Sequence, residues 1–222
     1  ESHLWKTEST KTYTSMTGDS GFHNAMADLV LADSVDRDRL SFCATPGGTG
    51  AIHHVLELVK LTGSNPKIWF SDPTWGNHLT IAKHLKMTVG KYSYFNNETR
   101  AVNFEAMVSD LSKISNGDIV VLHGCCHNPT GANLNNEQWN IIADLLLEKD
   151  AIPFIDIAYQ GFGEGIEEDA FGTRLLASKF PEMFIAASCS KNFGIYRERC
   201  GIVITVSKNP DISSITQGNL SY

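Results

Sequence analysis

Residues 119–157 read IVVLHGCCHNPTGANLNNEQWNIIADLLLEKDAIPFIDI, and they contain two short apolar runs separated by a helical pattern. The runs, 119–122 and 152–157, are rich in β-branched residues and almost entirely apolar, which is typical of strands buried on both faces of a sheet. Between them, residues 137–147 place apolar side chains three or four positions apart, and Asn135 or Asn136 can cap this helix. A strand, a helix and a strand in this order predict two parallel strands joined by a crossover helix.

The same alternation extends along the chain in both directions. Further apolar runs occupy residues 67–70, 88–92, 184–187 and 201–206. Helical patterns occupy residues 50–61, 78–85, 104–114 and 171–180, and Asn103 is placed to cap the third of them. The sequence therefore predicts the α/β class, with three layers in which helices cover both faces of a mostly parallel sheet. Ligands of such sheets bind beyond the carboxyl ends of the strands, so we expect the chemistry in the turns that follow the strands.

Length and charge limit the classes of function. The chain has 222 residues, 42% of them hydrophobic, and a formal net charge of −7. This length fits one large domain or two small ones, and the apolar fraction excludes a disordered chain. An acidic surface disfavours nucleic acids and anionic membranes as partners, and the apolar runs are too short to cross a bilayer. Five scattered cysteines favour a reducing compartment.

Two turns in the first half of the chain have unusual compositions. The turn Thr45-Pro46-Gly47-Gly48-Thr49-Gly50 precedes a helical pattern, and backbone N–H groups at such a place favour a phosphate. A tight turn with a threonine cap is the alternative. The other turn, residues 71–78, contains Trp75, whose ring can stack on a flat ligand or pack into the core.

The turn at residues 123–131 contains Cys125, Cys126 and His127, three residue types that bind metals. Adjacent cysteines cannot easily both bind one zinc ion, and the sequence offers no partner pair at a suitable spacing. We therefore predict no metal site. Asn128 follows in the same turn, where its side chain can donate a hydrogen bond to a ligand oxygen.

Two charged residues lie within or just after apolar runs. Asp156 interrupts the run 152–157, where a carboxylate is costly unless a charged or protonated group pairs with it; a place at the exposed end of the strand is the alternative. Lys191 follows the run 184–187 among small and aromatic residues. A desolvated lysine can form a Schiff base with a carbonyl, and nearby serines together with Arg199 can bind a phosphate. A lysine on the surface is the alternative.

These turns, in this order, resemble the class I aminotransferases of the pyridoxal-phosphate fold type I superfamily, and within it the aspartate and aromatic aminotransferases. The segments that carry the resemblance read HGCCHNPTG (123–131), DIAYQGF (156–162) and SKNFGIYRER (190–199). The resemblance implies pyridoxal 5′-phosphate as the cofactor, an amino acid and a 2-oxo acid such as 2-oxoglutarate as substrates, and a homodimer.

The resemblance also implies a catalytic set. Lys191 matches the lysine that binds the cofactor covalently and, when released, moves the α-proton of the substrate. Asp156 matches the carboxylate that keeps the pyridine nitrogen protonated, and His78 and His123 match groups behind it. Tyr159 completes the set as a donor to the phenolic oxygen of the cofactor.

Further residues match the cofactor-binding site of the family. Asn128 matches a second donor to the phenolic oxygen, and Trp75 matches the residue stacked on the ring. Tyr13 matches a tyrosine that reaches the phosphate site of the neighbouring subunit. The residues that match the phosphate-binding groups are Gly47, Gly48, Thr49, Ser188, Ser190 and Arg199.

Members of this family are considerably longer than this chain. We therefore expect residues 1–222 to form an incomplete cofactor-binding large domain, without the N-terminal arm and the C-terminal small domain. The arginine that holds the substrate's α-carboxylate would lie in the absent C-terminal part, so we expect the isolated chain to be inactive.

Two other functions remain open from the sequence. The chain can belong to another fold type I enzyme, a lyase or a decarboxylase with the same cofactor, or it can be an inactive partial chain. The sequence does not separate aspartate from aromatic substrates. A cytoplasmic location is expected, and a mitochondrial one stays open.

Overall fold

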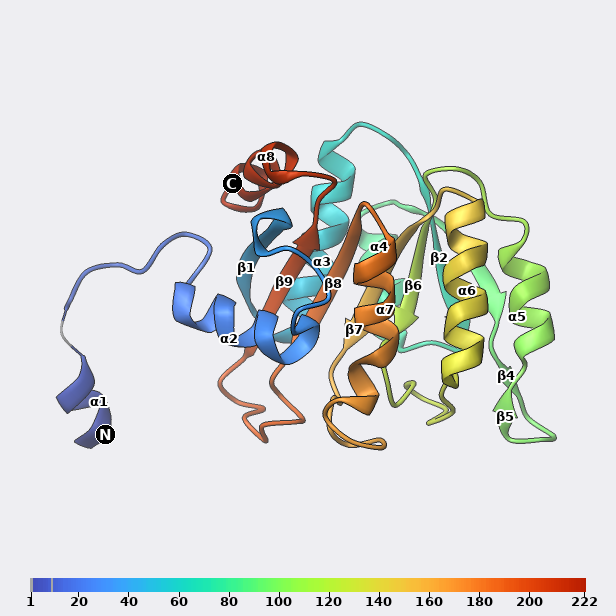
Figure 1. The fold of residues 1–222 in the computed structure, drawn as a ribbon, viewed down its shortest axis with the longest axis horizontal. Helices are drawn as coiled ribbons and strands as arrows, with labels where there is room; N and C mark the ends of the chain where they lie inside the picture. The colour runs from blue at the N-terminus through green and yellow to red at the C-terminus, as the bar shows by residue number, and fades with distance from the viewer. Residues whose placement is uncertain (1, 9) are drawn as a thin grey trace.

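The computed structural model describes residues 2–8 and 10–222 and shows a central sheet between two layers of helices (Figure 1). The strands of the described residues are β1 (Leu40–Pro46), β2 (Lys67–Asp72), β3 (Thr88–Ser93), β4 (Phe95–Asn96), β5 (Ala101–Val102), β6 (Ile119–His123), β7 (Ile152–Ile157), β8 (Met183–Ser188) and β9 (Cys200–Val206). Seven of them form one sheet in the order β1-β9-β8-β7-β6-β2-β3, and β4 pairs with β5 in a separate short ribbon.

The main sheet is mostly parallel, as the sequence predicted. The pairs β2–β3, β2–β6, β6–β7 and β7–β8 are parallel, whereas β9 runs antiparallel to both β8 and β1. The carboxyl ends of β2, β6, β7 and β8 consequently meet at one edge of the sheet. The turns after these strands and after β1, whose carboxyl end lies at the same edge, carry most of the predicted functional residues.

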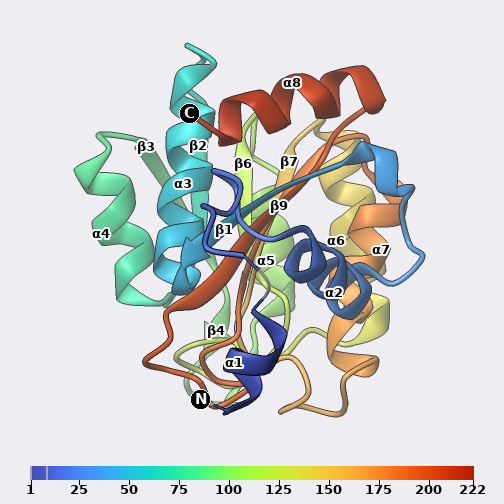
Figure 2. The same ribbon diagram turned by 90° about the vertical axis from the view of Figure 1, so that its left-hand side faces the viewer.

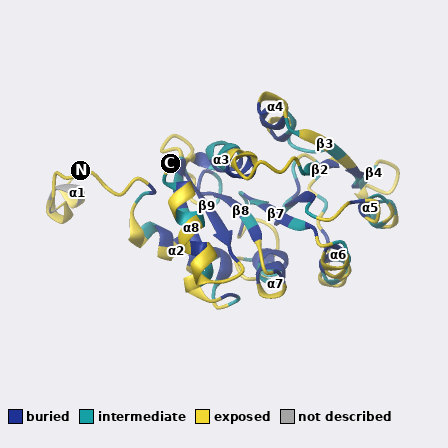
Figure 3. Ribbon diagram, turned by 90° about the horizontal axis from the view of Figure 1, so that it is seen from above, coloured by how far each residue is buried: buried dark blue, intermediate teal, exposed yellow. Residues whose placement is uncertain are grey.

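Helices cover both faces of the sheet, which confirms the three-layer prediction (Figure 3). One apolar core joins the sheet to α2 (Ser20–Leu31), α5 (Phe104–Leu111), α6 (Asn136–Glu148) and α7 (Phe171–Lys179). A second core joins the opposite face to α3 (Gly47–Leu61), α4 (Gly76–His84) and α8 (Pro210–Leu220). The short helices η1 (Arg37–Arg39) and η2 (Glu168–Ala170) lie in connections, and α1 (Ser2–Thr7) lies away from the sheet (Figure 1). In the described part of the chain, no helix combines the length and the apolar character needed to cross a membrane.

The helix starts correct two sequence predictions and confirm a third. Asn135 caps α6 through a capping box with Gln138, as expected. Asn103 precedes α5 but forms no side-chain cap, because its ψ of 71° differs from the extended backbone of a capping residue. Helix α3 begins at Gly47 rather than at residue 50, since the glycine-rich turn is itself the first turn of the helix. Glycine disfavours helices on its own, so only the packing of this turn reveals it.

Helix α8 covers the outer edge of the sheet at β1 (Figure 2). The Gln217 side chain accepts a hydrogen bond from the Phe42 N–H at 2.9 Å and donates one to the Phe42 carbonyl at 3.0 Å. Ser213 donates to the Leu40 carbonyl, and Ser41 donates to the Ser213 carbonyl. These side chains pair backbone groups that an edge strand would otherwise leave open to another strand.

Candidate active site

A cavity of about 170 Å³ lies at the carboxyl ends of β6, β7 and β8. His123, Cys125, Ala158 and Tyr196 line part of it. The predicted residues that line the rest are Gly48, Thr49, Trp75, Asn128, Asp156, Tyr159, Ser188, Ser190, Lys191 and Arg199. The fold thus brings together turns that lie up to about 150 residues apart in the sequence.

One end of the cavity is built to receive an anion. The first turn of α3 presents Gly48 and Thr49 there, and the buried hydroxyl groups of Ser188 and Ser190 face the same space. Arg199 completes this end, and its Nη1 donates to the Tyr196 carbonyl at 2.9 Å. A helix N-terminus, two hydroxyls and a guanidinium are donors that suit a phosphate.

Glycine at position 47 permits the arginine to approach α3. Gly47 has φ +75°, and a Cβ atom at this position would lie 2.5 Å from Nη2 of Arg199. Gly201 on β9 has a similar role, since its Cβ atom would meet the backbone of Gly47. The sequence motifs did not single out Gly201, because its neighbour is a segment that lies 154 positions earlier in the chain.

The lining of the cavity also includes a buried carboxylate, that of Asp156. The side chain of Asp156 is 12% exposed, and its Oδ2 accepts a hydrogen bond from His78 Nε2 at 2.9 Å. Burial alone would raise the pKa of Asp156, but the hydrogen bond from His78, together with the nearby His123 and Lys191, holds the pKa below its ordinary value. The alternative place for Asp156, at the exposed end of a strand, is therefore wrong.

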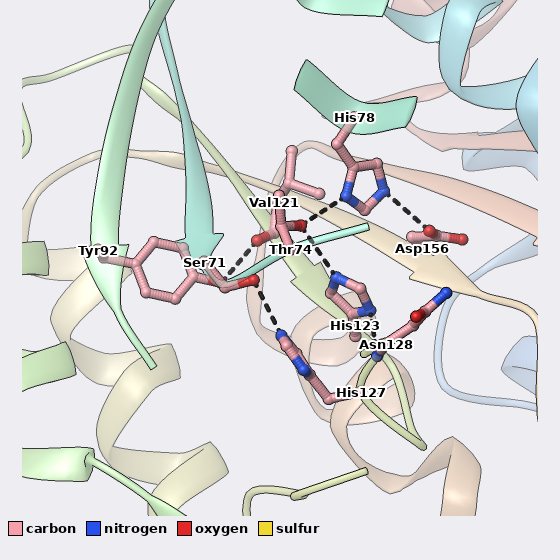
Figure 4. Close-up of polar contacts among 9 residues, drawn as sticks. All are labelled: Ser71, Thr74, His78, Tyr92, Val121, His123, His127, Asn128 and Asp156. Carbon is pink, nitrogen blue, oxygen red and sulfur yellow. Dashed lines mark hydrogen bonds and ion pairs between the residues drawn. The ribbon is translucent and has the colours of Figure 1, made fainter. Parts of the chain in front are cut away.

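A chain of hydrogen bonds continues from His78 to the turn after β6 (Figure 4). Thr74 Oγ1 lies 2.8 Å from His78 Nδ1 and 3.4 Å from His123 Nε2. The backbone N–H of Asn128 donates to His123 Nδ1 at 3.2 Å. Since His123 accepts at Nδ1, it carries its proton at Nε2 and donates to Thr74, which in turn donates to His78. Each donor in this series of hydrogen bonds therefore points toward the carboxylate of Asp156.

Burial keeps the histidines of this turn uncharged. Burial and nearby His78 lower the pKa of His123 to about 4, although Asp156 acts in the opposite direction. Burial and the neighbouring histidines also lower the pKa of His127 to about 2. His127 bonds to Ser71 and Thr130 and stacks on the ring of Tyr94 at 3.9 Å between centroids. It supports the turn from behind rather than lining the cavity.

Lys191 and the aromatic rings of Tyr159 and Trp75 also line the cavity. Lys191 is half-buried, and its Nζ lies 5.1 Å from the centroid of the Tyr159 ring. The ring of Trp75 meets the ring of His78 edge to face, with centroids 5.5 Å apart. Trp75 packs against the core, as one of its two alternatives predicted, and it also lines the cavity. Its stacking on a ligand ring stays a prediction.

Tyr13 lies outside this cavity. Its side chain is fully exposed on the segment between α1 and α2. The role implied by the resemblance concerns a neighbouring subunit, so that role stays a prediction.

The cysteines of the turn after β6 lie near a carboxylate that the sequence did not pair with them. Ligand atoms of Cys125, Cys126 and Asp169 lie within 4.8 Å of one another. The carboxylate of Asp169 already accepts hydrogen bonds from the backbone N–H groups of Gly161, Gly163 and Glu164. His127, the third residue of the sequence motif, is turned away toward Ser71.

Thr74 and Tyr196 are site residues for which the sequence motifs indicated no role. Thr74 precedes His78 by four residues, a spacing at which side chains meet near a helix start. That spacing is the signal that could have identified Thr74. Tyr196 lies within the quoted segment 190–199, but only the folded loop shows that it lines the cavity and binds Arg199 through its carbonyl.

Comparisons with known proteins agree with this site. The family model described as aminotransferase class I and II matches residues 3–218. An aromatic-amino-acid aminotransferase from Paracoccus denitrificans is 48% identical over 222 residues, which cover 100% of this chain and 56% of the relative. An aspartate aminotransferase from Haemophilus influenzae (strain ATCC 51907 / DSM 11121 / KW20 / Rd) is 38% identical over 217 residues, which cover 96% of this chain and 55% of the relative.

A solved structure gives the same result for the fold. It is an aromatic-amino-acid aminotransferase from Burkholderia pseudomallei, described as covalently bound to pyridoxal phosphate. It superposes with a TM-score of 0.94 at 33% identity, over 99% of this chain and 56% of that chain. The chain thus spans about half the length of the relatives it matches. The resemblance predicted from the sequence is confirmed, and the chain belongs to the class I and II aminotransferase family.

Proposed function

We propose that this chain is the cofactor-binding part of a pyridoxal-phosphate-dependent aminotransferase, which transfers an amino group between an amino acid and a 2-oxo acid. The observation that carries the proposal is a single cavity that contains a lysine amine, a buried ionised carboxylate and a phosphate-binding end. The relative that is 48% identical acts on aromatic amino acids by name, which favours an aromatic substrate over aspartate.

The residues of the cavity fit pyridoxal phosphate. Ser188, Ser190, Arg199 and the first turn of α3 would hold the phosphate, in a space that a side chain at position 47 would disturb. Trp75 would cover one face of the pyridine ring. Pyridoxal phosphate bound there would supply an electron sink for the charge that develops at the substrate's α-carbon.

Asp156 would hold a proton on the pyridine nitrogen. Its carboxylate stays ionised because His78 donates to Oδ2, and the hydrogen-bond chain through Thr74 and His123 fixes His78. The same series of hydrogen bonds begins at the backbone N–H of Asn128. The side chains of Asn128 and Tyr159 both line the cavity. Asn128 and Tyr159 would donate to the phenolic oxygen, so one network would position groups at both sides of the ring.

Lys191 would serve as both anchor and base. Its Nζ would hold the cofactor covalently before the substrate arrives. Once the amine of the substrate has displaced it, Nζ would remove the α-proton of the substrate. It would return this proton at the aldehyde-derived carbon of the cofactor. Tyr159 is placed to orient this amine, since its ring lies 5.1 Å from Nζ. We propose 2-oxoglutarate as the amino acceptor, and a homodimer in which Tyr13 contributes to the partner's phosphate site.

The covalent link at Lys191 gives a direct test. The chain is incubated with pyridoxal phosphate, reduced with borohydride and digested, and the labelled lysine is identified by mass spectrometry. We expect the label on Lys191, and we expect the K191A variant to lose it. The K208A variant, which changes an exposed lysine after β9, should keep it. Labelling chiefly at another lysine, or equal labelling of K191A and the wild type, would contradict the proposal.

A further inference from the structure

A cysteine lies at each end of the loop that carries Lys191 and Arg199. Cys189 precedes Ser190, Cys200 follows Arg199, and both thiols are free. The antiparallel register of β8 and β9 pairs Ser188 with Gly201, so Cys189 and Cys200 form the next opposed pair. The backbone N–H of Cys189 donates to the Cys200 carbonyl at 3.0 Å, which confirms that this pair continues the ladder.

Opposed positions of this kind come close to the geometry of a disulfide bond. Hydrogen-bonded antiparallel pairs have Cα atoms about 5.5 Å apart, within the range of about 4.4–6.8 Å found for disulfides. Their Cβ atoms lie about 5.5 Å apart, so the two ends of the loop must move about 1 Å closer to form the bond. Opposed side chains also point to the same face of a sheet. Cys189 Sγ lies 3.6 Å from Met26 Sδ, and Cys200 packs against the same core. Burial first, and then the neighbouring Cys200, raise the pKa of Cys189.

The two thiols differ in exposure. Cys189 is 3% exposed, whereas Cys200 is only half-buried. Small oxidants therefore reach Cys200 first, and Cys189 is positioned to resolve the product. The same division between an accessible and a resolving cysteine is typical of redox-active thiol pairs.

We propose that Cys189 and Cys200 form a reversible disulfide that closes the base of the loop 190–199. The oxidant is a low-molecular-weight disulfide such as glutathione disulfide. The Cys200 thiolate attacks one of its sulfur atoms and releases one thiol. The Cys189 thiolate then attacks the Cys200 sulfur and releases the second thiol. Two protons pass from the protein thiols to the released thiols, the protein loses two electrons, and the small disulfide gains them.

The loop has few contacts that would otherwise hold it. Its turns are closed by hydrogen bonds from Gly194 N–H to the Lys191 carbonyl and from Glu198 N–H to the Ile195 carbonyl. Phe193 and Tyr196 are more than half exposed. Closing the base of the loop restricts its opening, and this loop carries both the amine and the guanidinium of the cavity. The inference stands on the loop's geometry, whether or not the proposed cofactor binds.

Peptide mapping tests the proposal without any ligand. The chain is equilibrated with glutathione and glutathione disulfide at a series of ratios, alkylated with N-ethylmaleimide and digested with trypsin. We expect peptide 180–191 to become linked to peptide 200–208 as the disulfide fraction rises, and dithiothreitol to separate them. Cys125 and Cys126 lie in peptide 114–149 and Cys43 in peptide 40–60, so other pairings give different masses.

Two variants test whether the cross-link joins Cys189 to Cys200. The C200S variant should lose the cross-link, and the C43A variant should keep it. If C200S fails to fold, the wild-type map still decides. Glutathione that stays attached to Cys200 without a cross-link to Cys189, at every ratio, would overturn the proposal.

Hydrogen–deuterium exchange tests the effect on the loop. We expect amides of residues 192–199 to exchange at least twofold more slowly in the oxidised chain than in the reduced chain. Oxidised C200S should exchange like the reduced wild type. Equal exchange of the two wild-type forms would show that the cross-link does not restrict the loop and would overturn that part of the proposal.

Discussion

At the scale of single residues, Asp156 shows how a charge becomes stable inside a sheet. A carboxylate within an apolar strand requires a partner, and that requirement was visible in the sequence. The partner is His78, which lies 78 positions earlier in the chain and which the resemblance to the family had placed behind Asp156. Thr74 and His123 then fix the ring of His78, so the orientation of one imidazole depends on groups from two turns.

Gly47 makes a testable contribution at the same scale. In the G47A variant, the new methyl group would displace the guanidinium of Arg199 from the anion-binding end of the cavity. We expect affinity for pyridoxal phosphate to fall at least tenfold, which corresponds to about 1.4 kcal/mol. The measurement is a spectroscopic titration of the folded variant.

Gly63 supplies a matched control for this variant. Its φ of +71° is close to the +75° of Gly47, but among the described residues no atom lies within 4 Å of a Cβ atom built there. G63A should therefore lose stability through backbone strain, about 1–2 kcal/mol, without losing affinity. An equal loss of affinity in both variants would show that the contact with Arg199 is not the cause.

At the scale of elements, α8 has a function that its own sequence does not reveal. The apolar pattern of the sequence did not predict this helix, which occupies residues Pro210–Leu220. In the structure, Gln217 on this helix forms two hydrogen bonds with the backbone of Phe42 in the edge strand β1. A side chain on a helix thus replaces the neighbouring strand that β1 lacks on this side.

The Q217A variant tests this role. It leaves the N–H and the carbonyl of Phe42 without these partners, and we expect the free energy of unfolding to fall by about 1–3 kcal/mol. Urea denaturation is the measurement. S214A, on the exposed face of the same helix, should change stability by no more than about 0.5 kcal/mol. Equal stability of the Q217A variant and the wild type would contradict the role of Gln217.

At the scale of the whole molecule, the buried histidines link folding to pH. His123 and His127 have folded-state pKa values of about 4 and about 2, below the ordinary value of 6.5. Between pH 6.5 and about 4, the unfolded chain therefore binds protons that the folded chain does not. Stability is full above pH 6.5 and falls as the pH falls, because protons stabilise the unfolded chain.

We therefore expect the free energy of unfolding to decrease from pH 6.5 to pH 4.5. Each histidine contributes at most about 1.4 kcal/mol per pH unit in this range. The measurement is urea denaturation at several pH values, with H127Q as the variant that should show a smaller slope. Asp156 acts in a separate range, since its lowered pKa contributes stability that is lost below pH 3.8. A stability that stays constant or rises as the pH falls to 4.5 would contradict this assignment.

The composition of the cavity also predicts what the 222-residue chain can do alone. Among the described residues, Arg199 is the one arginine that lines the cavity, and it lies at the anion-binding end. A substrate carboxylate therefore finds no second guanidinium there. We expect the chain to bind pyridoxal phosphate at Lys191 but to form no measurable glutamate from an aromatic amino acid and 2-oxoglutarate. Glutamate formation that the K191A variant abolishes would contradict this expectation.

The sequence by itself determined the α/β class, the positions of most strands and helices, and most residues of the cavity. These features depend on local patterns: apolar periodicity, turn composition and long motifs such as residues 190–199. The start of α3 at Gly47 and the missing side-chain cap at Asn103 were not predicted, because packing decides them against local preference. Only the tertiary structure decided contacts such as Gly201 with Gly47 and Gln217 with Phe42. Each of these contacts joins residues far apart in the chain, and their distance depends on the register and packing of the whole sheet.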